Sequence, residues 1–270
     1  MRIYTLFVYV FLYTPIAIIA LFSFSAGRSA SQFEGFSVKW YGRALDNPFV
    51  MDALGNSLFV AFVSATLASI LGTLAAVGLQ GMRGPARAFF DALIYIAVMI
   101  PGIVIGIATL IALVTVFGVV NPWLLAVWPE GRTAPTLSMG MGSLIAAHTM
   151  FTLALVVIIV RARLASLEGV LSEASADLYA TPFGTFRQIT LPLIAPAVLA
   201  GFLLSFTFSF DDFIIAFFVA GSETTLPIYI FSSIRRGITP EVNAIGTMVM
   251  GASLIMLVVA QLILRRGAKR

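Results

Sequence analysis

The sequence predicts an all-α integral membrane protein with six transmembrane helices, and three observations support this fold class. Of the 270 residues, 60% are hydrophobic and only 10% are charged, whereas soluble domains carry roughly 25% charged residues. The charged residues are clustered, which leaves long windows without charge. Six of these windows approximate the ~20 apolar residues that cross about 30 Å of hydrocarbon.

The six apolar windows define the predicted spans. Because the apolar core of the first window exceeds the ~7–15 residues of a typical secretory signal, we expect a retained helix rather than a cleaved signal. No internal repeat, low-complexity tract or soluble insert is visible, so residues 1–270 are interpreted as one transmembrane domain. The predicted spans lie at about 3–25, 57–79, 92–118, 142–160, 197–219 and 243–264.

The second window carries a helical stripe of small side chains, which lets another helix approach closely. We expect this stripe to pack within the chain; a face against a second membrane-spanning chain is the alternative. The stripe consists of Ala61, Ala65, Ala68, Gly72 and Ala75.

The apolar run around the third window, 89–120, is too long for one untilted helix. Asp91 would be costly in lipid, so we place it at the cytoplasmic interface. Pro101 and Gly102 predict a kink or break further along, which can serve a gate or be only structural.

Aromatic residues predict contacts with the membrane surface outside the spans. The segment 33–56 is expected to form a short interfacial helix. Its anchors are Phe36, Trp40 and Tyr41, and Trp123 and Trp128 in the 119–141 loop are interpreted in the same way.

Positive charges predict the orientation. With the N-terminus inside, ten of the 16 Lys and Arg residues are cytoplasmic, and an even number of spans places both termini there. The 161–196 loop is then cytoplasmic. The ten are Arg2, Arg83, Arg87, Arg161, Arg163, Arg187, Arg265, Arg266, Lys269 and Arg270; the other six are Arg28, Lys39, Arg43, Arg132, Arg235 and Arg236.

The polar stretch 173–192 within this loop is structured rather than a passive connector. Thr181 followed by Pro182 is typical of a helix N-cap with proline at the first helical position. Glu173, Ala174 and neighbouring alanines favour helix before it. Two short helices separated by a turn are therefore predicted.

Two polar sites lie within apolar windows. His148, the only histidine, is expected to be buried, neutral and bonded to a neighbouring helix, because one histidine cannot make a metal site. Asp211 and Asp212 would each cost ~2.5–3.5 kcal/mol at the membrane centre. One interpretation is a cation-attracting site in the outer half of a path across the membrane. The alternative is that they cap a helix break or pair with Arg235 or Arg236.

The sequence carries no motif of a catalytic or cofactor site. It has no phosphate-binding Gly-x-x-x-x-Gly-Lys-Ser/Thr loop, no metal-ligand spacing and no nucleophile elbow. It also has no cysteine, which excludes disulfides and thiolate metal sites. The net charge of +4 lies at loop edges and does not indicate nucleic-acid binding. We predict a non-enzymatic chain with no metal and no bound cofactor.

Nearly the whole chain resembles the second permease subunit of spermidine/putrescine-type ABC importers, and the loop at 173–192 resembles the EAA loop of ABC importer permeases. The Glu173-Ala174 pair followed by Ile189-x-Leu191-Pro192 carries the loop resemblance. The further matching segments are Tyr41 before Asn56-Ser57, Ser205-Phe206-Thr207 through Asp211-Asp212-Phe213, Leu226-Pro227-Ile228-Tyr229, and 237–244 with Pro240-Glu241-Val242-Asn243-Ala244.

The resemblance implies a type I importer in the bacterial inner membrane. It implies a second permease subunit as heterodimer partner, two ATPase subunits that bind ATP and Mg²⁺, and an extracytoplasmic substrate-binding protein. Polyamines are the implied cargo; another amine, an opine or a metal ion is the alternative. A stand-alone channel or secondary transporter, or a scaffold or sensor, would need no such partners.

The resemblance also implies site residues. Asp211 and Asp212 would receive the cation. Ser175 stands where the family usually has alanine, and Tyr179 stands where it usually has glycine, so Tyr179 needs either an ordinary or a strained left-handed conformation. The ATPase contact is predicted at Glu173, Ala174, Asp177, Leu178, Tyr179 and Phe183.

Overall fold

The structure, a computed structural model, describes residues 2–29, 32–129, 132–167, 170–237 and 239–267. This part of the chain is helical apart from its connections and one isolated antiparallel bridge between Ser25 and Phe36. The predicted all-α fold class is confirmed. Five described helical runs are long and apolar enough to cross a membrane: 4–22, 48–80, 102–127, 141–165 and 182–211. A further long helix, α12, covers the sixth predicted window.

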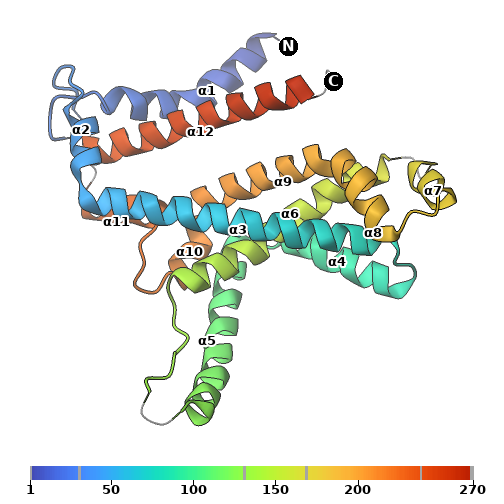
Figure 1. Cartoon of the computed structure of the whole chain (residues 1–270). Helices are drawn as coiled ribbons and strands as arrows, with labels where there is room; N and C mark the ends of the chain where they lie inside the picture. The colour runs from blue at the N-terminus through green and yellow to red at the C-terminus, as the bar shows by residue number, and fades with distance from the viewer. Residues whose placement is uncertain (1, 30–31, 130–131, 168–169, 238, 268–270) are drawn as a thin grey trace. The chain divides into compact units, whose positions relative to one another are not determined.

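The chain divides into two compact units. The first comprises residues 1–55 and 226–270, and the second comprises 56–225. In the first unit α1 and α12 lie side by side (Figure 1). Its helices are α1 (Arg2–Phe22), α2 (Lys39–Asp46), the start of α3 (Pro48–Gln80), α11 (Leu226–Arg236) and α12 (Pro240–Gly267).

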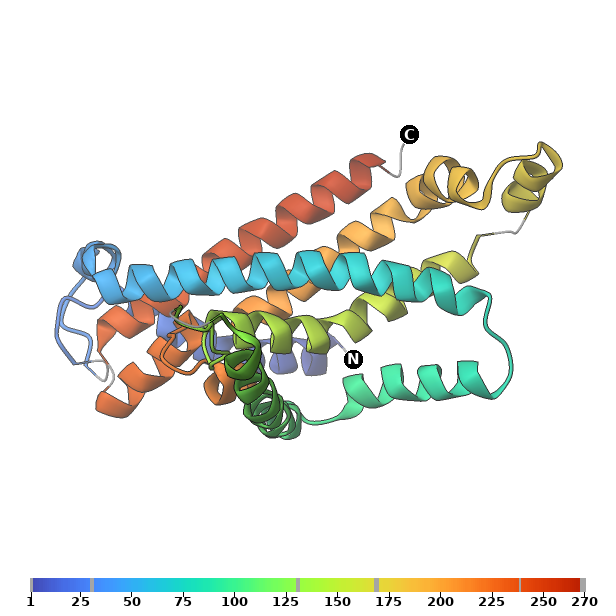
Figure 2. The same ribbon diagram turned by 60° about the horizontal axis from the view of Figure 1, so that its bottom comes forward.

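The second unit holds the remainder of α3 and the helices that carry the candidate sites. Here α4 runs alongside α6, while α5 leaves in a different direction (Figures 1 and 2). Its helices are α4 (Pro85–Met99), α5 (Gly102–Val127), α6 (Met141–Ala165), α7 (Val170–Asp177), α8 (Pro182–Thr185), the π-helix η1 (Phe186–Thr190), α9 (Leu191–Asp211) and α10 (Ile214–Val219).

The small-residue stripe of α3 packs within the chain, as predicted. A side chain at Gly72 would place its Cβ 2.8 Å from the Cβ of Val156 on α6, so only glycine allows this approach. Ala61, Ala65 and Ala68 are fully buried. The core of the unit joins α3, α6 and α9 through Ala68, Ala76, Leu79, Val156, Val157, Val160, Leu164 and Ile194.

The predicted third span at 92–118 is two helices rather than one. Helix α4 ends at Met99, and Ile100 is extended, with φ −67° and ψ 133°. Residues before proline avoid the α conformation, and Pro101 has no N–H to continue the helix. The predicted break at Pro101 is therefore confirmed, and the apolar segment extends further at both ends than expected.

The prediction that Trp40 is an anchor at the membrane surface is wrong, and so is the placement of Trp123 in a loop; the interfacial role of Trp123 and Trp128 stays a prediction. Trp40 lies on the predicted short helix but is buried, and its Nε1 donates to the backbone oxygen of Ser25 at 2.9 Å. Arg43 stacks over its ring, 4.9 Å from the centroid. Trp123 lies on α5 rather than in a loop, because this helix continues past Pro122 to Val127.

Candidate functional site

The segment after α6 folds into two short helices joined by a turn, as predicted. Thr181 caps α8: its Oγ1 accepts a hydrogen bond from the backbone N–H of Gly184 at 3.1 Å, and Pro182 occupies the first helical position. Residues 186–190 form a π-helix that leads directly into α9. Residues 168–169 of this loop, like Lys269 and Arg270, lie outside the described residues.

Tyr179 adopts the left-handed conformation, with φ 59°. The backbone N–H of Tyr179 donates to the oxygen of Ala176 at 2.9 Å, and that of Ala180 donates to the oxygen of Ser175 at 3.1 Å. This pair of bonds is the Schellman motif, in which glycine usually holds the left-handed position. Of the two conformations that the sequence left open for Tyr179, the structure has the left-handed one.

The segment 173–192 exposes large apolar side chains and buries a polar one. The side chains of Leu178, Tyr179 and Phe183 are 82%, 95% and 71% exposed, although all three are large and mainly apolar. In contrast, the hydroxyl-bearing Ser175 is only 6% exposed, and its Oγ lies 2.8 Å from Oγ1 of Thr185. This bond ties α7 to α8. Glu173, Ala174 and Asp177 are exposed beside the apolar group.

The two adjacent aspartates lie at a helix break. Helix α9 ends at Asp211, and Asp212 is extended, with φ −71° and ψ 121°. The carboxylate of Asp212 accepts a hydrogen bond from the backbone N–H of Ala216 in the first turn of α10, at 2.9 Å. This satisfies one of the N–H groups that a helix start leaves without a partner.

Asp211 and Asp212 differ in their surroundings. Asp211 is exposed, whereas Asp212 is partly buried. The helix break predicted for the pair is present, and Asp212 caps the helix that follows it. Arg235 and Arg236, the alternative partners, belong to the other compact unit, so that pairing stays a prediction.

His148 on α6 is 2% exposed and bonded to a neighbouring helix, as expected. Its Nδ1 lies 2.7 Å from Oγ of Ser209 on α9. Its Nε2 lies 3.5 Å from Oδ2 of Asp212, too far for a strong hydrogen bond but close enough for an electrostatic contact. Sequence reasoning treated His148 and Asp212 separately, since no spacing along the chain relates them.

The prediction that the chain holds no metal ion concerns side chains of the kind just described. Among the described residues, no group of three His, Cys, Asp or Glu side chains could hold a metal ion. The absence of a bound cofactor stays a prediction.

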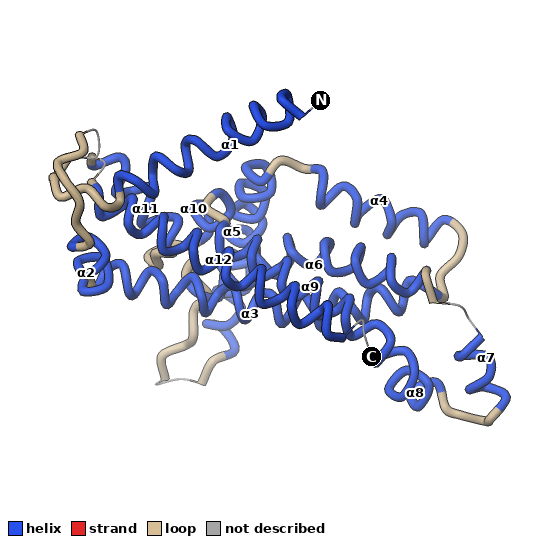
Figure 3. The backbone as a smooth tube through the Cα atoms, turned by 90° about the horizontal axis from the view of Figure 1, so that it is seen from above, coloured by secondary structure: helices blue, strands red, loops and turns tan. Residues whose placement is uncertain are grey.

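The loop and the aspartate break stand at opposite ends of α9 (Figures 1 and 3). A family model described as "Binding-protein-dependent transport system inner membrane component" matches residues 68–270. The chain belongs to this family. It is a membrane-spanning permease subunit of an ABC importer.

Relatives in the family align with nearly the whole chain. The putrescine transport system permease protein PotI of Escherichia coli (strain K12) is 36% identical over 97% of this chain and 89% of its own length. The spermidine/putrescine transport system permease protein PotC of Haemophilus influenzae is 38% identical over 96% and 94%. The sulfate transport system permease protein CysT of E. coli (strain K12) is 32% identical over 80% and 77%.

Solved structures share the fold. A bacterial ABC transporter involved in the import of the acidic polysaccharide alginate matches with a TM-score of 0.77 at 16% identity, over 98% of this chain and 94% of its own. The MetNI methionine ABC transporter, in an inward-facing conformation, matches with a TM-score of 0.61 at 18% identity, over 79% and 94%. The predicted type I importer permease fold is confirmed.

Proposed function

We propose that this chain moves a polyamine, or a closely related small organic cation, into the cytoplasm as one of two different permeases of an ABC importer. The observation that carries the cargo is the 36–38% identity to putrescine and spermidine/putrescine permeases over at least 96% of the chain. The aspartate pair supports it, because two carboxylates suit a ligand with two or more positive charges. The sulfate and alginate transporters show that the fold itself does not select a cation.

The remaining subunits are two ATPases, which bind ATP and Mg²⁺, and an extracytoplasmic binding protein. This chain supplies no catalysis and no bound cofactor. One structural neighbour was solved with a substrate-bound periplasmic protein, which supports a partner of that kind. Opines, other amines and metal ions are the alternative cargoes.

The coupling surface consists of the six exposed residues predicted from the sequence: Glu173, Ala174, Asp177, Leu178, Tyr179 and Phe183. Three large apolar side chains in water are unfavourable unless a partner covers them. Leu178 and Phe183 fill an apolar groove of the ATPase, while Glu173 and Asp177 contact basic residues at its rim. Glu173→Arg is expected to weaken co-purification of the ATPase while leaving membrane insertion unchanged.

One helix connects the coupling surface with the aspartates. Helix α9 has 21 residues, which corresponds to a length of about 30 Å. Near its start, the backbone oxygen of Leu193 accepts a hydrogen bond from Nε of Arg163 at 3.1 Å, which joins α9 to the end of α6. A displacement of the loop by the ATPase is therefore transmitted along α9 to Asp211 and Asp212.

This mechanism requires the loop to be cytoplasmic, with both termini on the same side. The chain has no cysteine, so single cysteines test the orientation directly. Ser166, at the end of α6, and Ser222, after α10, are both exposed. A cysteine at Ser166 is expected to be protected from an impermeant thiol reagent added outside, and one at Ser222 is expected to react. The reverse pattern would exclude coupling to cytoplasmic ATP.

A further inference from the structure

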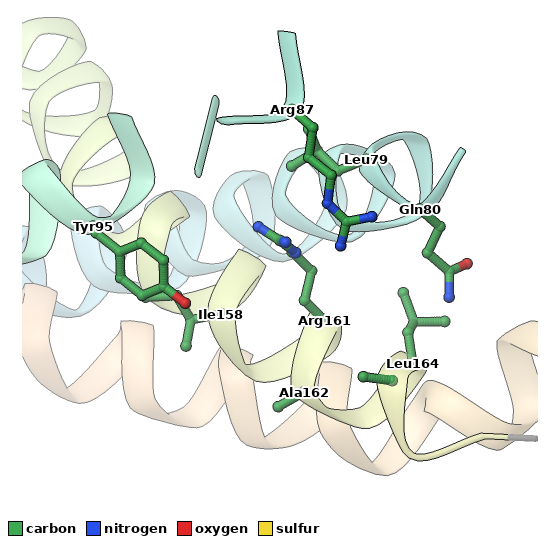
Figure 4. Close-up of a pocket in the computed structure, with 9 residues that line it drawn as sticks. Leu79, Gln80, Arg87, Tyr95, Ile158, Arg161, Ala162 and Leu164 are labelled. Carbon is green, nitrogen blue, oxygen red and sulfur yellow. The ribbon is translucent and has the colours of Figure 1, made fainter. Parts of the chain in front are cut away.

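A cavity of about 470 Å³ lies in the second unit where α3, α4 and α6 meet. The segment 173–192, which carries the coupling surface and is called the coupling loop below, follows α6 in the chain. Two arginines line it: Arg87 from the start of α4 and Arg161 from the last turns of α6. Their guanidinium groups lie next to each other, with Tyr95 on one side and Gln80 on the other (Figure 4). The remaining lining is apolar.

One acid faces the two arginines. Asp91 accepts a hydrogen bond from Arg161, and its Oδ2 lies 3.8 Å from Nε of Arg87. The hydrogen bond from Arg161 holds the pKa of Asp91 below its usual value. Asp91 therefore stays ionised at neutral pH. Two positive charges against one negative charge leave the group with a net positive charge.

An apolar cavity of about 500 Å³ lies between the same three helices, and Leu79 lines both cavities. Its lining residues on α6 lie one to three turns before Arg161, so it extends along the helices toward the interior of the membrane. Its larger side chains are Phe90, Leu93, Ile94, Met150, Leu153 and Val157.

We infer that these two cavities form a binding site for an anionic phospholipid. Arg87 and Arg161 would hold the phosphate of the headgroup, and an acyl chain would lie in the apolar cavity. Charge complementarity favours this occupant, because basic pockets between helices at the cytoplasmic side of a membrane suit anionic headgroups. Tyr95 adds a ring with a polar tip near the boundary between the two environments.

The lipid site lies close in the chain to the coupling loop. Arg161 lies four residues before the end of α6, and the coupling loop follows that end. An anionic lipid held there would fix the start of α4 relative to the end of α6. It would thereby stabilise the base from which the coupling loop projects.

The test uses the complete permease, purified in detergent with the subunits that assemble with it. Lipid binding is measured by native mass spectrometry during titration with phosphatidylglycerol, with phosphatidylcholine of the same acyl chains, and with inorganic phosphate. We expect preferential binding of phosphatidylglycerol. Equal binding of both lipids, or equally tight binding of phosphate alone, would contradict the inference.

Charge variants give effects of opposite sign. Arg87→Gln and Arg161→Gln should each weaken phosphatidylglycerol binding about fivefold, the effect of about one basic residue near a membrane surface. Asp91→Asn should strengthen phosphatidylglycerol binding by a similar factor. A gain in binding cannot result from misfolding.

Arg83→Gln is the matched control, because this exposed arginine lies four positions from Arg87 and outside the cavity. It should leave binding unchanged. Weaker binding in Asp91→Asn, or an equal loss in Arg83→Gln, would show that the arginines serve only the internal ion pair.

Discussion

The coupling loop and the aspartate break are both polar interruptions of an apolar chain, but they differ in which side chains they expose and which they bury. The loop buries the hydroxyl of Ser175 and exposes Leu178 and Phe183. The break keeps Asp212 partly buried, and its carboxylate accepts a hydrogen bond from the backbone N–H of Ala216. Exposed apolar side chains in a structured loop indicate a missing partner. A polar group satisfied by its own chain indicates a structural role.

Asp211 does not share the role of its neighbour. Its side chain is exposed, and the helix ends at this residue, so the break points the two carboxylates into different surroundings. We therefore predict that the proposed cation contact depends more on Asp211 than on Asp212, which also caps α10.

The largest effect is expected at the coupling loop. Leu178→Asp should reduce ATPase co-purification at least about tenfold, because burial of one leucine contributes about 1.5–3 kcal/mol and the new charge opposes it. Leu178→Met is the matched control and should bind nearly as well as the parent chain. Normal assembly of Leu178→Asp would remove this residue from the contact.

The aspartates should separate transport from folding. Asp211→Asn is expected to lower polyamine uptake several-fold with normal assembly. Asp212→Ala should lower the free energy of unfolding by about 0.5–2 kcal/mol through loss of the cap, whereas Asp212→Asn keeps an acceptor and should retain most of it. Uptake of radiolabelled spermidine and thermal unfolding of the purified chain measure the two effects. Equal behaviour of Asp211→Asn and Asp212→Asn in both assays would refute the division of roles.

Tyr179 offers a smaller effect with an unusual sign. Tyr179→Gly should stabilise the turn by about 1 kcal/mol, because a left-handed conformation strains every residue with a Cβ. Leu178→Gly, at a neighbour without positive φ, should destabilise it instead. Hydrogen exchange of the backbone amides in α7 and α8 reports both changes. Faster exchange in Tyr179→Gly would argue against the strained turn.

The smallest effect concerns the bond that holds the loop together. Ser175→Ala should cost about 0.5 kcal/mol, since the hydrogen bond to Thr185 is only partly shielded from water. Thr185→Val removes the same bond from the other side. In a double-mutant cycle, the two changes together should cost no more than about one of them alone. Additive costs would show that the bond does not couple α7 to α8.

Much of this architecture follows from local patterns in the sequence. The Thr181-Pro182 cap and the break at Pro101 depend on neighbours along the chain, and the small-residue stripe is visible as a helical period; the structure confirms all three. The six coupling residues and the cation site stay predictions.

The missed features depend on residues far apart in the chain. An aromatic residue next to basic ones outside the spans suggests a membrane anchor at Trp40. Only the fold shows that it is buried and that the backbone oxygen of Ser25 accepts its hydrogen bond. Nothing in the sequence relates His148 to Asp212, or Arg87 to Arg161. Helix packing alone brings each of these pairs together.

We propose that this chain imports a polyamine with energy delivered through its coupling loop. The most direct measurement is uptake of radiolabelled putrescine and spermidine into proteoliposomes that contain the complete complex, ATP inside and the binding protein outside. We expect ATP-dependent accumulation of polyamine that Leu178→Asp abolishes and Leu178→Met preserves. A complex that accumulates another solute but no polyamine would contradict the cargo. Accumulation that is independent of ATP and unchanged in Leu178→Asp would contradict the coupling mechanism itself.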